Sequence, residues 1–213
     1  MNAPAPGWYG KIAGLGDFAS RRLPSEWVAS CDTWLSTVLA DAREDLGARW
    51  LDVYLSAPLL RFAWSARVVD ERWWFGVLMP SCDSVGRYFP LVIAAFAADS
   101  PTSPGEASSL ERWYGDVGRA ALATLDDDGG SLDGLERALT EIPSWQAGSS
   151  PSGASALLAT VAELASGRGR SAWWAHDGSP ADAVIVDGLP RGTCFADLLA
   201  WRPHDDLSTV VGR

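Results

Sequence analysis

Two kinds of hydrophobic periodicity alternate along the chain and predict a mixed α/β protein. Short runs rich in aromatic and β-branched residues predict strands at 8–13, 59–65, 73–79, 91–98, 172–175 and 183–186. Apolar residues spaced three and four apart predict helices at 25–46, 48–55, 110–125, 132–142 and 193–201, with a small alanine-rich helix ending near 164. Three strands follow one another in the middle of the chain, which favours an antiparallel meander.

These elements predict a three-layer α/β/α sandwich, in which a mixed, largely antiparallel sheet carries helices on both faces. A chain of 213 residues is long enough for one sizeable core. We expect a single domain over residues 8–201, between a disordered N-terminal tail at 1–7 and a polar C-terminal tail at 202–213. The Pro/Ser/Gly-rich segment 99–109 is expected to be a connector and marks a possible sub-boundary.

Tryptophan is unusually frequent, with 12 in the chain. Most of them lie in predicted strands or on apolar helix faces, which indicates an aromatic core. Trp73 and Trp74 are adjacent in a predicted strand, so their side chains must point to opposite faces of the sheet. A sheet covered on both sides would bury both; otherwise one of them marks a contact surface.

Charge and composition exclude several classes of function. Lys and Arg number 17 against 27 Asp and Glu, a net charge of −10, which disfavours general binding to nucleic acid or to anionic membranes. We find no apolar run long enough for membrane insertion and no secretory signal in residues 1–7, so we expect a cytoplasmic protein. The cysteines, Cys31, Cys82 and Cys194, are far apart and form no CxxC motif, which argues against a disulfide framework or a zinc site.

A glycine-rich turn at 14–16 begins like a dinucleotide-binding fingerprint. However, Arg21, Arg22 and Pro24 follow where the phosphate-binding helix should already be running. We therefore interpret the glycines as a tight turn and predict no cofactor and no metal.

The loop between the strands at 73–79 and 91–98 carries unusual chemical content. Its Ser81 and Cys82 invite a hydrolase interpretation, because a nucleophile often sits at a strand end. A nucleophile needs a base, and the two histidines, His176 and His204, are distant in sequence. A small cysteine or serine hydrolase is kept as the alternative function; it predicts a lowered pKa for Cys82 and hydrogen-bond reach to His176.

Five charged residues are candidates for a structural or partner-binding role: Asp17, Arg21, Arg61, Asp83 and Arg87. A buried Arg61 or Arg87 needs an acidic partner, and the natural choices are Asp17 and Asp83. We expect the loops 14–22 and 81–88 to lie near one another at one edge of the sheet. Asp17, Arg21, Asp83 and Arg87 would then hold that edge in shape or present it to a partner.

Two sequence blocks carry a resemblance to a known family. The first, WYGKIAGLGDFASRRLP at 8–24, has Gly-Lys, then Gly-Asp-Phe, then Arg-x-Leu-Pro. The second has Ser56, Pro58, Arg61 and Phe62, followed by GVLMPSCDSVGRYFPL at 76–91. Together they resemble the TagF (ImpM) family of type VI secretion-associated proteins over residues 8–98.

The resemblance implies a regulatory role. TagF-like proteins are cytoplasmic, post-translational repressors of the type VI secretion system that act by protein–protein contact, with an Fha-type (forkhead-associated) scaffold protein as partner. The resemblance implies no catalytic residues, because the family is not an enzyme family. It leaves the oligomeric state and the contact surface open.

Overall fold

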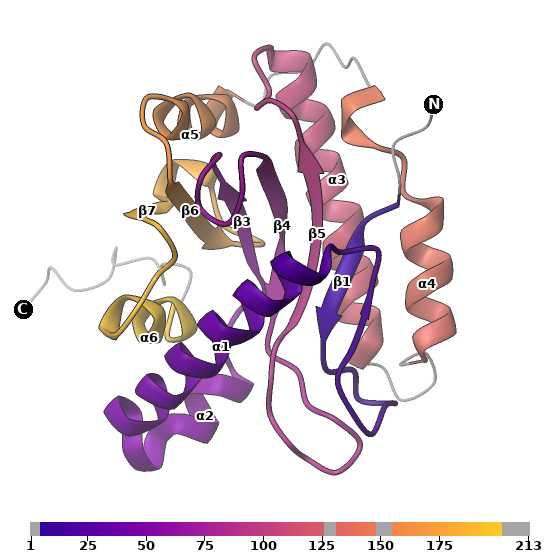
Figure 1. Cartoon of the computed structure of the whole chain (residues 1–213), viewed down its shortest axis with the longest axis vertical. Coiled ribbons are helices and arrows are strands. Elements are labelled where there is room, and N and C mark those ends of the chain that lie inside the picture. Colours follow the sequence, from indigo (N-terminus) through magenta and orange to yellow (C-terminus); the bar gives the residue numbers. More distant parts are fainter. Residues whose placement is uncertain (1–4, 126–130, 148–154, 202–213) are drawn as a thin grey trace, which may run out of the picture.

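A seven-stranded antiparallel sheet forms the centre of the computed structural model, which describes residues 5–125, 131–147 and 155–201 (Figure 1). The strands are β1 (Gly7–Gly10), β2 (Ala19–Arg21), β3 (Leu60–Trp64), β4 (Trp73–Met79), β5 (Leu91–Ala97), β6 (Arg170–Ala175) and β7 (Val184–Asp187). Their order in the sheet is β2-β1-β5-β4-β3-β6-β7, with every neighbouring pair antiparallel. The predicted meander is β3-β4-β5.

Helices cover both faces of this sheet, which confirms the predicted three-layer α/β/α architecture (Figure 1). The helices are α1 (Ser25–Leu46), α2 (Trp50–Leu55), α3 (Pro104–Leu122), α4 (Leu132–Glu141), α5 (Ser155–Ala165) and α6 (Thr193–Leu199). Buried residues of α1, α2 and α6 pack on one face, and those of α3, α4 and α5 pack on the other. Among the described residues, no helix combines the length and apolar character needed to cross a lipid bilayer.

The adjacent tryptophans of β4 contribute to different cores, as their alternation predicts. Trp73 stacks on Phe75 at 6.0 Å between ring centroids, on the side that α3 covers. Trp74 lies 5.0 Å from Trp27 of α1 on the opposite side. Both are buried, so neither is a contact surface, and truncating a core Trp to Ala is expected to cost roughly 3–5 kcal/mol.

Two elements differ from their predictions. The segment 99–109 is not a connector throughout, because α3 begins at Pro104. Ser103 and Glu106 form a capping box, and Pro104 takes the first helical turn, where a missing N–H has no cost. The second difference is β2, three residues that the sequence pattern did not distinguish from a loop.

The predicted tails fall mostly outside the described residues, which exclude 1–4 and 202–213. Gly7, assigned to the N-terminal tail, is instead the first residue of β1.

One end of the sheet gathers the segments of interest. Gly10 of β1 pairs with Leu91 of β5, which pairs with Met79 of β4, so these three strands share an end. The segments 11–18 and 80–90 leave the sheet there, and α2 lies at the same end of the molecule (Figure 1). We call this the loop end.

Candidate functional site

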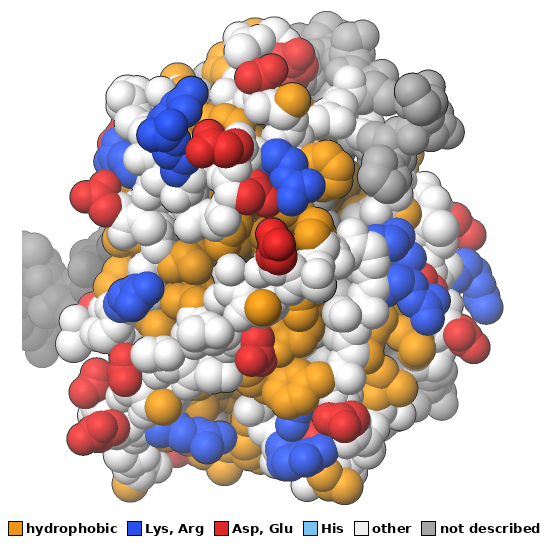
Figure 2. Space-filling view, in the orientation of Figure 1, with side chains coloured by type: hydrophobic (Ala, Val, Ile, Leu, Met, Phe, Trp, Pro, Cys, Tyr) orange, Lys and Arg blue, Asp and Glu red, His pale blue; other side chains and the backbone are white. Residues whose placement is uncertain are grey.

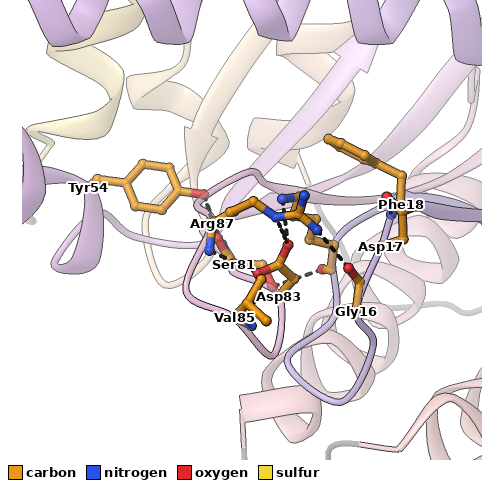
Figure 3. A network of polar contacts seen from close by, with 9 residues as sticks. Gly16, Asp17, Phe18, Tyr54, Ser81, Asp83, Val85 and Arg87 are labelled. Atoms are coloured by element: carbon orange, nitrogen blue, oxygen red, sulfur yellow. Dashed lines mark hydrogen bonds and ion pairs between the residues drawn. The ribbon is translucent and has the colours of Figure 1, made fainter.

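The two predicted loops are neighbours at the loop end, joined by hydrogen bonds (Figure 3). The Ser84 N–H donates to the carbonyl of Leu15 at 3.0 Å. Nη2 of Arg87 donates to the carbonyl of Gly16 at 2.7 Å, and the Ser81 hydroxyl donates to the carbonyl of Lys11 at 2.8 Å. The prediction that the loops 14–22 and 81–88 lie together is confirmed for the first part of 14–22 only, because residues 19–21 form β2. We call the joined segments 11–18 and 80–90 the loop pair.

Asp83 is the centre of the loop pair, and its carboxylate is enclosed. Oδ2 accepts from Nζ of Lys11 at 2.8 Å and from Nε of Arg87 at 2.6 Å. Oδ1 accepts the backbone N–H groups of Val85 at 3.1 Å and Arg87 at 2.9 Å. Four donors satisfy the roughly four acceptor positions of a carboxylate, so little capacity is left for a substrate or a metal ion.

These donors determine the protonation state of Asp83. Burial alone would raise the pKa of its carboxyl, but the hydrogen bonds from Lys11 and Arg87 outweigh burial and hold that pKa well below its usual range. Asp83 is therefore an anion at any physiological pH. A carboxylate with a strongly lowered pKa is unsuited to general acid–base catalysis near neutrality.

Lys11, the single lysine of the chain, is a member of the site that the sequence reasoning left out. Its side chain is only 4% exposed, and its ammonium also lies 4.8 Å from the centre of the Phe18 ring. The preceding residue, Gly10, has φ 134° and allows the end of β1 to lie close to the backbone before β5, since a Cβ there would lie 2.0 Å from the carbonyl oxygen of Pro90. Because Lys11 is the only lysine of the chain, the sequence alone could have singled it out as a candidate site residue.

Tyr54 of α2 fixes the other side of the loop pair (Figure 3). Its hydroxyl donates to the carbonyl of Ser81 at 2.9 Å and accepts the Ser81 N–H at 3.0 Å. Phe89 N–H donates to the same carbonyl, at 3.0 Å. The 80–90 loop is thus held at both of its ends and at its centre.

Above the hydrogen-bonded residues around Asp83, which we call the base of the loop pair, several side chains are exposed. Val85 is 70% exposed and Phe18 is 45% exposed, while the side chain of Arg87 is 59% exposed. Asp17 is exposed, and its carboxylate accepts the N–H of Phe18 at 2.8 Å, which shapes the turn. The face shown in Figure 2 mixes acidic, basic and apolar side chains, so the net negative charge forms no single-sign patch there.

Arg21 does not belong to this group, and the prediction that it holds the same edge is wrong. Arg21 is the last residue of β2 and pairs with Trp8 of β1. Since Gly10 is the residue of β1 at the loop end, Arg21 lies farther along the strand, away from that end. Nη1 of Arg21 bonds Glu136 of α4 at 3.2 Å. Arg22 bonds the same carboxylate through two nitrogens, at 2.6 and 2.9 Å, and the Trp8 indole N–H donates to it at 2.5 Å.

Arg61 likewise has a partner that the sequence reasoning did not name. Neither Asp17 nor Asp83 pairs with it; Nη1 bonds Glu111 of α3 at 2.6 Å, and Nε donates to Nδ1 of His176 at 3.1 Å. Burial, followed by the positive charge of Arg61, lowers the pKa of His176 to about 4. His176 is thus a neutral acceptor within a structural network.

The hydrolase alternative required a hydrogen bond between His176 and a nucleophile. Within the described part of the chain, no hydrogen bond joins His176 to Cys82 or Ser81, and Nδ1 accepts from Arg61. Over the same residues, no group of three or more His, Cys, Asp and Glu side chains is placed to hold a metal ion.

Comparisons with known proteins point to one family. The model of the TagF N-terminal domain, described as type VI secretion system-associated, matches residues 7–142. The crystal structure of PA0076 from Pseudomonas aeruginosa PAO1 is similar, with a TM-score of 0.75 and 30% sequence identity over 94% of this chain and 96% of that chain. No curated protein matches.

Proposed function

The chain belongs to the TagF family of type VI secretion system-associated proteins, and on this premise we propose that it is a non-enzymatic, post-translational repressor of such a system. It would act in the cytoplasm, by binding a scaffold protein of the forkhead-associated (Fha) type. The loop pair is the surface we propose for that contact.

The observation that carries the proposal is the contrast between the base of the loop pair and its surface. At the base, Asp83 is enclosed and saturated with donors, so the loops are fixed before any partner arrives. At the surface, Phe18, Val85 and Arg87 are exposed. Aromatic and arginine side chains are enriched at protein interfaces, and preorganised loops lose little entropy on binding.

The chemistry of the same residues supports a non-enzymatic role. The Asp83 carboxylate already accepts four hydrogen bonds from groups of the protein, and the Ser81 hydroxyl donates to a backbone carbonyl. His176, the base that a hydrolase would need, is held neutral against Arg61. In the part of the chain that the structure describes, no specific contact favours the hydrolase alternative.

A binding and secretion experiment tests the proposal. The purified chain is titrated with the Fha-type scaffold from the same cells, and secretion is assayed with the chain deleted and overexpressed. Val85→Asp is expected to weaken scaffold binding at least tenfold and to relieve repression, because it places a charge in an apolar contact. Ala40→Asp, on the exposed face of α1, is the control.

Equal scaffold affinity for the two variants would contradict the proposed contact surface. Secretion that is unchanged on both deletion and overexpression would contradict the repressor role itself.

A further inference from the structure

The outer face of α2 does not have the composition of a helix that faces water. Five of its six residues are apolar or aromatic, and Asp52 is the exception. Trp50 and Tyr54 are buried, but Leu51 is 40% exposed and Leu55 is 61% exposed. A surface helix usually carries polar residues on its outer side, and a helix that is apolar on all sides is usually buried. The exposed leucines therefore indicate a face that another protein covers.

Leu51 and Leu55 form one stripe, because residues four apart lie side by side on a helix. We call these two leucines the α2 face. Among the described residues, seven large apolar side chains are exposed, and four of them belong to α2 and the loop pair: the two leucines, Phe18 and Val85. Single exposed apolar residues are ordinary on a protein surface, whereas a group at one end of the molecule marks an interaction site.

Tyr54 joins α2 to the loop pair and fixes their relative position. Its ring centroid lies 5.7 Å from that of Tyr88. Its hydroxyl makes two hydrogen bonds with the backbone of Ser81. The α2 face and the exposed residues of the 80–90 loop therefore lie at the same end of the molecule and are held together before any partner arrives (Figure 1).

The loop pair alone is small for a stable protein contact. Nine of its 19 residues are exposed. A standard protein–protein interface takes about 20–30 residues from each partner. Neighbouring elements must supply the rest of the surface, and α2 is a neighbour that is bonded to the loops and carries exposed apolar side chains.

We propose that the α2 face belongs to the contact with the Fha-type scaffold, which buries Leu51 and Leu55 together with Phe18 and Val85. This inference rests on the proposed function and specifies the surface that the scaffold must present. The α2 face has no basic side chain, and the exposed Asp52 lies between its two leucines in the sequence. An acidic or phosphorylated segment is therefore disfavoured there, and the scaffold meets α2 with apolar side chains.

Calorimetric titration of the full chain with the Fha-type scaffold tests the α2 face. Leu55→Asp is expected to weaken binding at least tenfold, because it places a charge in an apolar contact. Leu55→Ala should weaken binding by about threefold, since it removes apolar area and keeps the helix. Ala159→Asp, exposed on α5 in the other helix layer, is the control. Circular dichroism melting shows whether each variant is folded, and Leu55→Ala decides if Leu55→Asp is not.

The failure of this inference is distinguishable from the failure of the proposed function. If Val85→Asp weakens binding while the Leu55 variants bind as Ala159→Asp does, the contact is confined to the loop pair. The inference is then overturned and the proposed contact surface stands. If Val85→Asp and the Leu55 variants all bind as the control does, both are overturned.

Discussion

Asp83 and Glu136 each accept several hydrogen bonds, but the two carboxylates differ in burial and in the origin of their donors. This difference indicates that they have different structural roles. Asp83 is enclosed, and half of its donors are backbone groups of its own loop. The side chain of Glu136 is 16% exposed, and all of its donors are side chains distant in sequence, from β1, from β2 and from Arg22, which follows β2. The first arrangement fixes the shape of a loop, while the second ties α4 to the edge of the sheet. A change near Asp83 should therefore reach the exposed surface, and a change at Glu136 should affect stability alone.

The largest effect is expected from Lys11→Met, which removes the cation buried beside Asp83. Breaking a buried ion pair from one side leaves an uncompensated charge and typically costs 3–5 kcal/mol, so we expect a loss of roughly 3 kcal/mol in the free energy of unfolding. Urea denaturation measures it, with the exposed Arg137→Met as the matched control. A loss below about 1 kcal/mol would show that Arg87 and the backbone suffice for Asp83.

A smaller effect is expected from Glu136→Gln, with a distinctive pH dependence. Burial would raise the pKa of Glu136, but Arg22 and Trp8 outweigh burial and lower it to about 2. In the unfolded chain this carboxyl protonates near pH 4.3, as ordinary glutamates do. The unfolded state then binds more protons between these values, so the stabilisation is full above about pH 4.3 and is lost as the pH falls toward 2.

After allowance for solvent screening, Glu136→Gln should cost about 1–2 kcal/mol at pH 7 and flatten the stability profile below about pH 4.3. Glu141→Gln, exposed on the same helix, is the control. Denaturation at a series of pH values measures both effects. If the stability of Glu136→Gln falls with decreasing pH as steeply as that of the parent chain, the stabilising role given to Glu136, and its contrast with Asp83, would be contradicted.

The sequence predicted those parts of the molecule that depend on local pattern. The opposite orientations of Trp73 and Trp74 followed from strand alternation. Asp83 was one of the two acids expected to pair with Arg61 or Arg87, and the structure pairs it with Arg87. The start of α3 was missed although Ser103 and Glu106 spell a capping box, because prolines and serines nearby resemble a connector.

Long-range partners were beyond sequence reasoning. Glu111 and Glu136 lie 50 and 115 residues from Arg61 and Arg21, and their contacts depend on how the helix layers pack on the sheet. Arg21 was misplaced because β2 is too short for alternation to reveal it. Without that strand, nothing in the sequence separates Arg21 from the loop that precedes it.

The smallest effect on stability, and the sharpest test of the comparison, is expected from Arg87→Ala. Its guanidinium is mostly exposed, and Lys11 still neutralises Asp83 after its removal, so the free energy of unfolding should fall by less than about 1 kcal/mol. Arg87→Ala also removes the hydrogen bond to the Gly16 carbonyl and an exposed positive charge of the loop pair.

The decisive measurement is the affinity of Arg87→Ala for the Fha-type scaffold, by calorimetric titration, with circular dichroism melting on the same samples and Arg137→Ala as control. We expect at least tenfold weaker binding by a chain that melts within a few degrees of the parent. Parental affinity in the folded variant would contradict the claim that the loop pair is the partner-binding surface.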